Sequence, residues 1–304
     1  MAGNWTKLTV KGHVNDLDGI VAVMSMLDNG LMIEDYSDFS FNGMYGELVD
    51  EQILHADKSV VNVSLFVPEE KNLLEYKAYI EARLTALGIS FDVLAEGMNE
   101  EDWSESWKQY YKPIPLGKVT IVPAWEDYTA SEGEIIIKMD PGMAFGTGTH
   151  ETTRLVMRIM QDVIKGGERV LDVGTGSGIL SICASKLGAK SCNAYDIDPV
   201  AVKVARENAE ADGCTNITVG VSDLLHGVDK SGGKYDFCVA NIVSDIIIRM
   251  MPDIDGYLAE GAPLILSGII NSRKDEVREC AISHGFRIER EEYENDWVAL
   301  LLRK

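Results

Sequence analysis

The stretch that decides the fold reads Asp172-Val173-Gly174-Thr175-Gly176-Ser177-Gly178 and begins within an apolar run at residues 169–173. Glycines at such a turn permit positive φ angles and let a ligand approach the backbone closely. The amides of the helix that begins near Ile179 would then face that ligand. Asp196 ends the next apolar run, 22 residues after Gly174, where a carboxylate can accept hydrogen bonds from both hydroxyls of a ribose.

Strand and helix patterns alternate on both sides of this loop, which predicts a parallel sheet covered on both faces. The predicted strands are residues 169–173, 191–196, 216–221, 235–240 and 263–267. Residues 286–293 and 297–302 then form two strands joined by a short acidic turn, which indicates a hairpin. A Rossmann-like, mostly parallel seven-stranded sheet that closes in this way is compatible with the class I methyltransferase α/β fold.

Two cofactors compete for the glycine loop. The dinucleotide fingerprint is G-x-G-x-x-G, whereas this chain has G-x-G-x-G with Asp172 before it. S-adenosylmethionine has no phosphate, and Asp172 could help to hold its amine while repelling a pyrophosphate. The sequence therefore favours S-adenosylmethionine, with Gly174, Gly176 and Asp196 as further contacts.

Three other segments carry candidate site residues. Asp223 follows the third strand and could reach the adenine amino group or act as a helix N-cap. The glycine- and threonine-rich residues 140–153 could fold over a ligand, with Phe145 as an apolar cover and threonine hydroxyls as donors, Thr149 among them. The alternative reading of this segment is a capped helix start, with Thr149 or Thr152 as the cap. Asn241 ends the fourth strand, where its side chain can accept a hydrogen bond from a substrate amine, or it is simply a polar strand end.

The first half of the chain has a different pattern. Its runs read strand, helix, strand, strand, helix, strand, which predicts a small ferredoxin-like α+β domain over residues 1–95. Residues 96–127 form a bridge in which Trp103 and Trp107 either pack onto a neighbouring domain or contact a substrate protein. Three prolines at positions 113, 115 and 123 are expected to interrupt regular structure there. Residues 128–304 form the methyl-donor domain.

The composition of the chain limits the classes of partner that it can bind. The 304 residues are 46% hydrophobic and carry a formal net charge of −21. Such acidity disfavours a large nucleic-acid footprint and favours a basic protein partner, or it serves solubility alone. The five cysteines include no C-x-x-C pair, so neither a disulfide framework nor a zinc site is indicated. With no apolar signal region and no run of about 18 apolar residues, we expect a cytoplasmic protein that does not enter a membrane.

Taken together, these motifs closely resemble the ribosomal protein L11 methyltransferase family. The resemblance covers essentially the whole chain and rests on the small N-terminal domain and five motifs. These are Trp103-x-x-x-Trp107-Lys108, residues 140–153, residues 172–178, Asn241-Ile242 and Leu266-Ser267-Gly268-Ile269. Thr175 replaces a cysteine often found in the family.

The resemblance implies that Thr153, Gly174, Asp196 and Asn241 bind S-adenosylmethionine. It also implies that the N-terminal domain captures ribosomal protein L11 and that the second domain methylates several of its amines. In that reaction Asn241 would orient the amine. His150 is either a proton acceptor or a histidine that structures the loop.

Three alternatives remain. The first is a methyltransferase of glutamine or nucleobase amino groups. Such enzymes commonly carry an Asn-Pro-Pro-aromatic motif, and the absence of both prolines from Asn241-Ile242-Val243-Ser244 disfavours this alternative. A noncatalytic module that kept the donor pocket is disfavoured by the intact Asn241 and Phe145. A nucleotide-dependent oxidoreductase is disfavoured by the glycine spacing.

Overall fold

The computed structural model describes residues 5–28, 30–37, 57–68, 71–96, 112–139, 148 and 150–304. The chain divides into two compact units, Met1–Tyr110 and Tyr111–Lys304. The division falls inside the segment 96–127 that the sequence assigns to a bridge. Trp103 and Trp107 of that segment lie outside the described residues.

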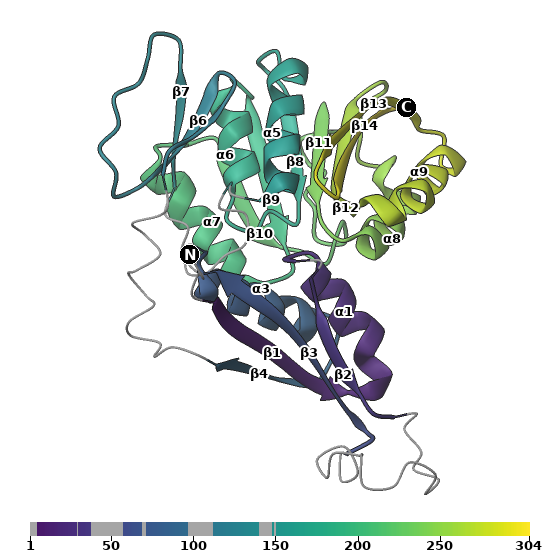
Figure 1. The fold of residues 1–304 in the computed structure, drawn as a ribbon. Helices are drawn as coiled ribbons and strands as arrows, with labels where there is room; N and C mark the ends of the chain where they lie inside the picture. The colour runs from purple at the N-terminus through teal and green to yellow at the C-terminus, as the bar shows by residue number, and fades with distance from the viewer. Residues whose placement is uncertain are drawn as a thin grey trace, which may run out of the picture. The chain divides into compact units, whose positions relative to one another are not determined.

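The first unit contains an antiparallel sheet of four strands in the order β2-β3-β1-β4 (Figure 1). The described elements are β1 (Trp5–His13), η1 (Val14–Asp16), α1 (Leu17–Ser25), β2 (Met32–Asp35), β3 (Val60–Pro68), α3 (Leu73–Ala86) and β4 (Phe91–Glu96). The succession of strands and α-helices and the order of the strands confirm the ferredoxin-like α+β arrangement.

Alternation along the strands gives this sheet one apolar face. The fully buried apolar side chains of β3 are Val61, Val63, Leu65 and Val67. Helix α1 contacts β1 and β3, and α3 contacts β4. Ile20 of α1 and Ile80 of α3 are fully buried, so the core of this unit lies between the helices and one face of the sheet.

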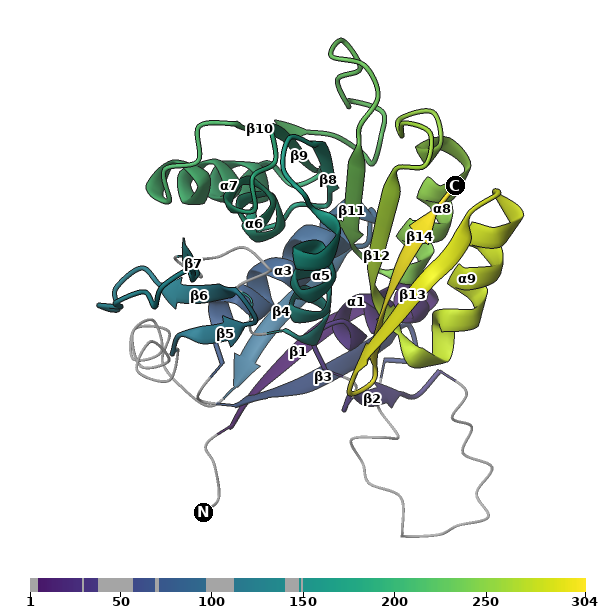
Figure 2. The same cartoon turned by 90° about the horizontal axis from the view of Figure 1, so that it is seen from above.

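The second unit contains a sheet of seven strands in the order β10-β9-β8-β11-β12-β14-β13 (Figure 2). The strands are β8 (Arg169–Val173), β9 (Ser191–Asp196), β10 (Ile217–Val221), β11 (Phe237–Asn241), β12 (Pro263–Ile270), β13 (Arg287–Glu294) and β14 (Trp297–Arg303). The pairs from β10 to β12 are parallel, and β14 runs antiparallel to both of its neighbours. This order, with one antiparallel strand, confirms the predicted class I methyltransferase fold.

Among the described residues, five helices cover this sheet. They are α5 (Glu151–Val163), α6 (Ile179–Lys186), α7 (Pro199–Ala211), α8 (Ser244–Ile254) and α9 (Lys274–Ser283). Helices α5, α6 and α7 lie on one face and α8 and α9 on the other (Figure 2). Because both faces are covered, strand residues such as Leu171, Val239 and Ile265 are fully buried. Among the described residues, none of the helices combines the length and the apolar character needed to cross a membrane.

A small three-stranded sheet precedes α5, and the sequence did not predict it. Its strands are β5 (Ile114–Leu116), β6 (Val119–Pro123) and β7 (Ile135–Met139), in that order. The expectation that prolines interrupt regular structure here is wrong for two positions. Pro115 lies on β5, an edge strand that can lack one N–H donor, and Pro123 is the last residue of β6.

Candidate active site

The glycine-rich loop connects β8 to α6, and its three glycines all have positive φ. The angles are +75° at Gly174, +56° at Gly176 and +85° at Gly178. A side chain would be strained at each position. A Cβ atom at Gly174 would also lie 2.3 Å from Cγ2 of Ile242. The loop therefore packs tightly against the segment that follows β11, in a shape that requires glycine.

Asp172 holds this loop from within the sheet. It is fully buried, and its Oδ2 accepts hydrogen bonds from the hydroxyls of Thr175, at 2.7 Å, and Ser181, at 2.8 Å. Burial raises the pKa of Asp172 to about 6, and the nearby Asp196 adds to the rise, while the two hydroxyl donors oppose it. Its Oδ1 is buried and has no hydrogen-bond partner among the described residues.

Asp196 joins the end of β9 to the same loop. Its carboxylate accepts from the backbone N–H of Gly176 at 2.9 Å and of Asp198 at 3.1 Å. The side chain is almost fully buried. The acid and the glycine loop that the sequence paired are thus in direct contact.

Asn241 lies beside the loop, at the end of β11. Since Ala240 pairs with Val173 in the parallel ladder, Asn241 and Gly174 leave the sheet at the same level. The Nδ2 of Asn241 donates to Oγ1 of the buried Thr153, on the first turn of α5, at 3.4 Å. Its Oδ1 is buried, and no described residue donates a hydrogen bond to it. The structure therefore brings Asp196 into contact with the loop that contains Asp172, Gly174 and Gly176, and it brings Thr153 and Asn241 into contact beside that loop.

A bulge in β12 supports the segment after Asn241. The register of β12 against β14 shifts between Leu266 and Ile269, and Gly268 has φ +81°. A Cβ atom at Gly268 would lie 2.4 Å from the carbonyl oxygen of Ile242, whose N–H donates to Ser267 at 3.0 Å. The sequence analysis noted Leu266-Ser267-Gly268-Ile269 only as a motif of the family resemblance and did not predict the bulge. The signal that indicates a bulge is Gly268 itself, an isolated glycine within an apolar strand.

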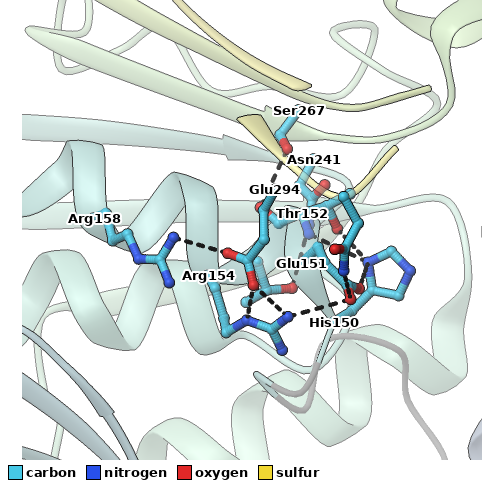
Figure 3. Close-up of polar contacts among 10 residues, drawn as sticks. His150, Glu151, Thr152, Arg154, Arg158, Asn241, Ser267 and Glu294 are labelled. Atoms are coloured by element: carbon cyan, nitrogen blue, oxygen red, sulfur yellow. Dashed lines mark hydrogen bonds and ion pairs between the residues drawn. The ribbon is translucent and has the colours of Figure 1, made fainter. Parts of the chain in front are cut away.

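His150 begins α5 and caps it. Its Nδ1 accepts from the backbone N–H of Thr152 at 3.3 Å and lies 2.9 Å from the hydroxyl of the same residue (Figure 3). Its ring forms a T-shaped contact with the ring of Trp297, with 5.1 Å between centroids. The reading of this segment as a capped helix start is confirmed, but the cap is His150 and not Thr152.

The remaining candidates lie farther out or are not described. Asp223 is half-exposed and forms an ion pair of 2.7 Å with Arg249. The chain turns through Leu224, at φ 50°, and no helix begins there, so the N-cap reading of Asp223 is wrong. Phe145 and Thr149 lie outside the described residues.

Matches to known proteins span the chain. Residues 4–304 match the family model described as Ribosomal protein L11 methyltransferase (PrmA). The chain belongs to this family. A ribosomal protein L11 methyltransferase of Exiguobacterium sp. is 41% identical over 315 residues, and the match covers 99% of both chains. One from Streptococcus pneumoniae (strain Hungary19A-6) is 42% identical, over 98% of this chain and 95% of the relative.

A solved relative agrees with the sequence matches. The crystal structure of the ribosomal protein L11 methylase from Lactobacillus delbrueckii subsp. bulgaricus is 38% identical, with a TM-score of 0.60. The match covers 64% of this chain and 100% of that chain. Family membership confirms the predicted resemblance and identifies this chain as a methyltransferase.

Proposed function

We propose that this chain transfers methyl groups from S-adenosylmethionine to lysine side-chain and N-terminal amines of ribosomal protein L11. One observation carries the proposal beyond family membership. Asn241 leaves the sheet at the same level as Gly174, and its Oδ1 atom is buried and lacks a donor among the described residues. An unsatisfied buried acceptor costs about 1–3 kcal/mol, so an N–H group that reaches it is bound favourably. A neutral amine offers such a group and keeps its lone pair for attack.

The described residues fit the methyl donor. The glycine loop has the positive φ angles of a ligand-binding turn, and Asp196 ends its strand where a ribose would lie. The carboxylate of Asp172 favours an ammonium group over a pyrophosphate. When bound, S-adenosylmethionine supplies an electrophilic methyl group on a positively charged sulfur. Thr153 is assigned to the same site, and Phe145, Thr149 and Asp223 remain candidate contacts at its margins.

Positioning is the main task left to the protein. A free lysine has a pKa of about 10.4, and the amine must be neutral to attack. Desolvation in the site lowers that pKa, and Asn241 orients the neutral amine. Because Nδ1 of His150 caps the N-terminus of α5, we assign His150 a structural role at the start of this helix and not a role in proton transfer.

The charge of the first unit supports a role in substrate recognition. Residues 1–110 contain 20 aspartates and glutamates but only 7 lysines and arginines. Such a surface attracts a basic ribosomal protein and repels a phosphate backbone. The ferredoxin-like domain would therefore capture L11 without direct contact to RNA. In this proposal the segment 96–127 connects the two domains, and the reaction takes place in the cytoplasm.

Mass spectrometry tests this proposal. Purified L11 is incubated with the enzyme and a donor that carries an isotope-labelled methyl group, and fragmentation then locates the label. We expect label on lysine side chains and on the N-terminal amine. Unlabelled L11, with an active enzyme on another amine substrate, would contradict the substrate assignment.

Calorimetry separates the remaining functional classes. We expect the chain to bind S-adenosylhomocysteine and not NAD. Binding without label on L11 or any other amine would favour the noncatalytic module. Binding of NAD alone would overturn the donor site.

A further inference from the structure

The first turn of α5 makes polar contacts with β12 and with the hairpin of β13 and β14 (Figure 3). The polar contacts are Ser267 Oγ to the carbonyl of Thr152 at 3.1 Å, Asn295 Nδ2 to Glu151 at 3.0 Å, and Arg154 to Glu294. The ring contact of His150 with Trp297 adds to them. A polar turn at the end of the chain therefore holds a helix that begins about 140 residues earlier.

Glu294, the last residue of β13, is the centre of these contacts. Its Oε1 accepts from Arg154, at 2.8 Å from Nε and 2.5 Å from Nη2. Its Oε2 accepts from Arg158 Nη1 at 2.8 Å. The side chains of Glu294 and Arg154 are only 21% and 18% exposed, so solvent screens this pair less than a surface ion pair.

The two arginines need this carboxylate. Arg154 and Arg158 lie four residues apart on α5, where like charges repel each other. Arg154 also lies in the first turn, at the positive end of the helix dipole, where a cation is unfavourable. Glu151 lies 3.3 Å from Arg154, and Glu294 adds the acceptor that both arginines share.

The same turn contains Thr153, which we assign to the donor site. Thr153 directly precedes Arg154, and its hydroxyl contacts Asn241. The chain also enters α5 from the segment 140–149. A displacement of this turn by about 1 Å would therefore move Thr153 away from Asn241, enough to weaken a site that depends on geometry.

We propose that Glu294 is a positioning residue for the methyl-donor site, acting through Arg154 and Arg158. This inference rests on the proposed function, because it assigns the first turn of α5 to donor binding. Glu294 itself need not touch the donor.

Glu294→Gln tests the proposal, because it removes the charge and keeps the size of the side chain. Glu292→Gln is the matched control. Glu292 lies on the same strand and pairs with Arg290, which contacts Asp162 near the other end of α5. We expect Glu294→Gln to raise the Kd for S-adenosylhomocysteine and the donor KM about five- to ten-fold, with kcat changed less than about two-fold. The control should lose a similar amount of thermal stability and keep the wild-type Kd.

A double-mutant cycle then locates the route. In an Arg154→Met, Arg158→Met background, Glu294→Gln should change the Kd by less than about two-fold, because both contacts of Glu294 with α5 are already absent. Equal Kd values for wild type and Glu294→Gln, or equal losses in Glu294→Gln and the control, would overturn the proposal. Wild-type protein that binds no S-adenosylhomocysteine would instead contradict the proposed function.

Discussion

The side-chain amide of Asn241 lies 3.4 Å from the hydroxyl of Thr153, although 88 residues separate them in the chain. One residue ends the fourth strand of the parallel series and the other belongs to the first turn of α5. Because the amide N–H is engaged by Thr153, the carbonyl oxygen of Asn241 has a fixed direction. This contact makes Asn241 a defined acceptor for an incoming amine.

Thr153→Val removes the hydroxyl while nearly keeping the shape of a fully buried side chain. Asn241 would lose the contact that fixes its amide, so we expect kcat/KM to fall about ten-fold, or about 1.4 kcal/mol of transition-state stabilisation. The free energy of unfolding should change by less than about 1.5 kcal/mol. Steady-state kinetics with chemical denaturation check both values. An unchanged kcat/KM would show that the Thr153 hydroxyl does not orient Asn241.

Gly268→Ala tests the bulge beneath Ile242. A methyl group there meets the Ile242 carbonyl oxygen at 2.4 Å, and the residue must also hold φ +81°. We expect a loss of about 2–4 kcal/mol in the free energy of unfolding, together with reduced turnover. Gly261→Ala is the control, because Gly261 has φ +70° and no atom within 4 Å of an added Cβ. It should cost only about 1–2 kcal/mol and leave turnover intact. Equal losses in the two variants would mean that the close approach at Gly268 is unimportant.

Asp172→Asn separates stability from donor binding. Burial raises the pKa of Asp172 from 3.8 to about 6, so the folded state binds this proton more tightly than the unfolded chain. The contribution of this group to stability is therefore present below the unfolded pKa and is lost as pH rises towards and beyond 6. At pH 7.5 the variant should gain on the order of 1–3 kcal/mol in unfolding free energy relative to wild type, and this difference should shrink towards pH 4.

The same Asp172→Asn variant should bind S-adenosylhomocysteine about ten-fold more weakly at pH 7.5, because the carboxylate is lost. Chemical denaturation at several pH values and calorimetry provide the two measurements. A stability difference that is constant between pH 4 and 7.5 would refute the raised pKa. Unchanged affinity would remove Asp172 from the donor site.

The sequence predicted the elements whose causes are local. Strand patterns that alternate with helix patterns predict the parallel sheet, and two strand patterns joined by a short acidic turn predict the hairpin of β13 and β14. The glycine loop and Asp196 could be paired from spacing alone, because parallel strands end at the same edge of a sheet. Asn241 followed from the same rule.

The parts that the sequence did not predict depend on distant contacts. Nothing near Arg154 in the chain indicates that Glu294 accepts its hydrogen bonds, since the partner lies 140 residues away. The role of His150 as a helix cap is likewise not apparent from its neighbours in the sequence, because its ring packs against the distant Trp297. Strands β5 and β6 were missed because prolines signal irregular structure unless they lie at an edge or an end of a sheet.

Single-turnover methylation of L11 by Asn241→Ala, with donor held at saturation, tests most directly whether Asn241 positions the amine. We predict that the rate constant of methyl transfer falls about 100-fold or more, while the Kd for S-adenosylhomocysteine changes less than about five-fold and the midpoint of thermal unfolding shifts only a few degrees. A wild-type rate of methyl transfer in this variant would contradict the assignment of Asn241 as the residue that positions the amine.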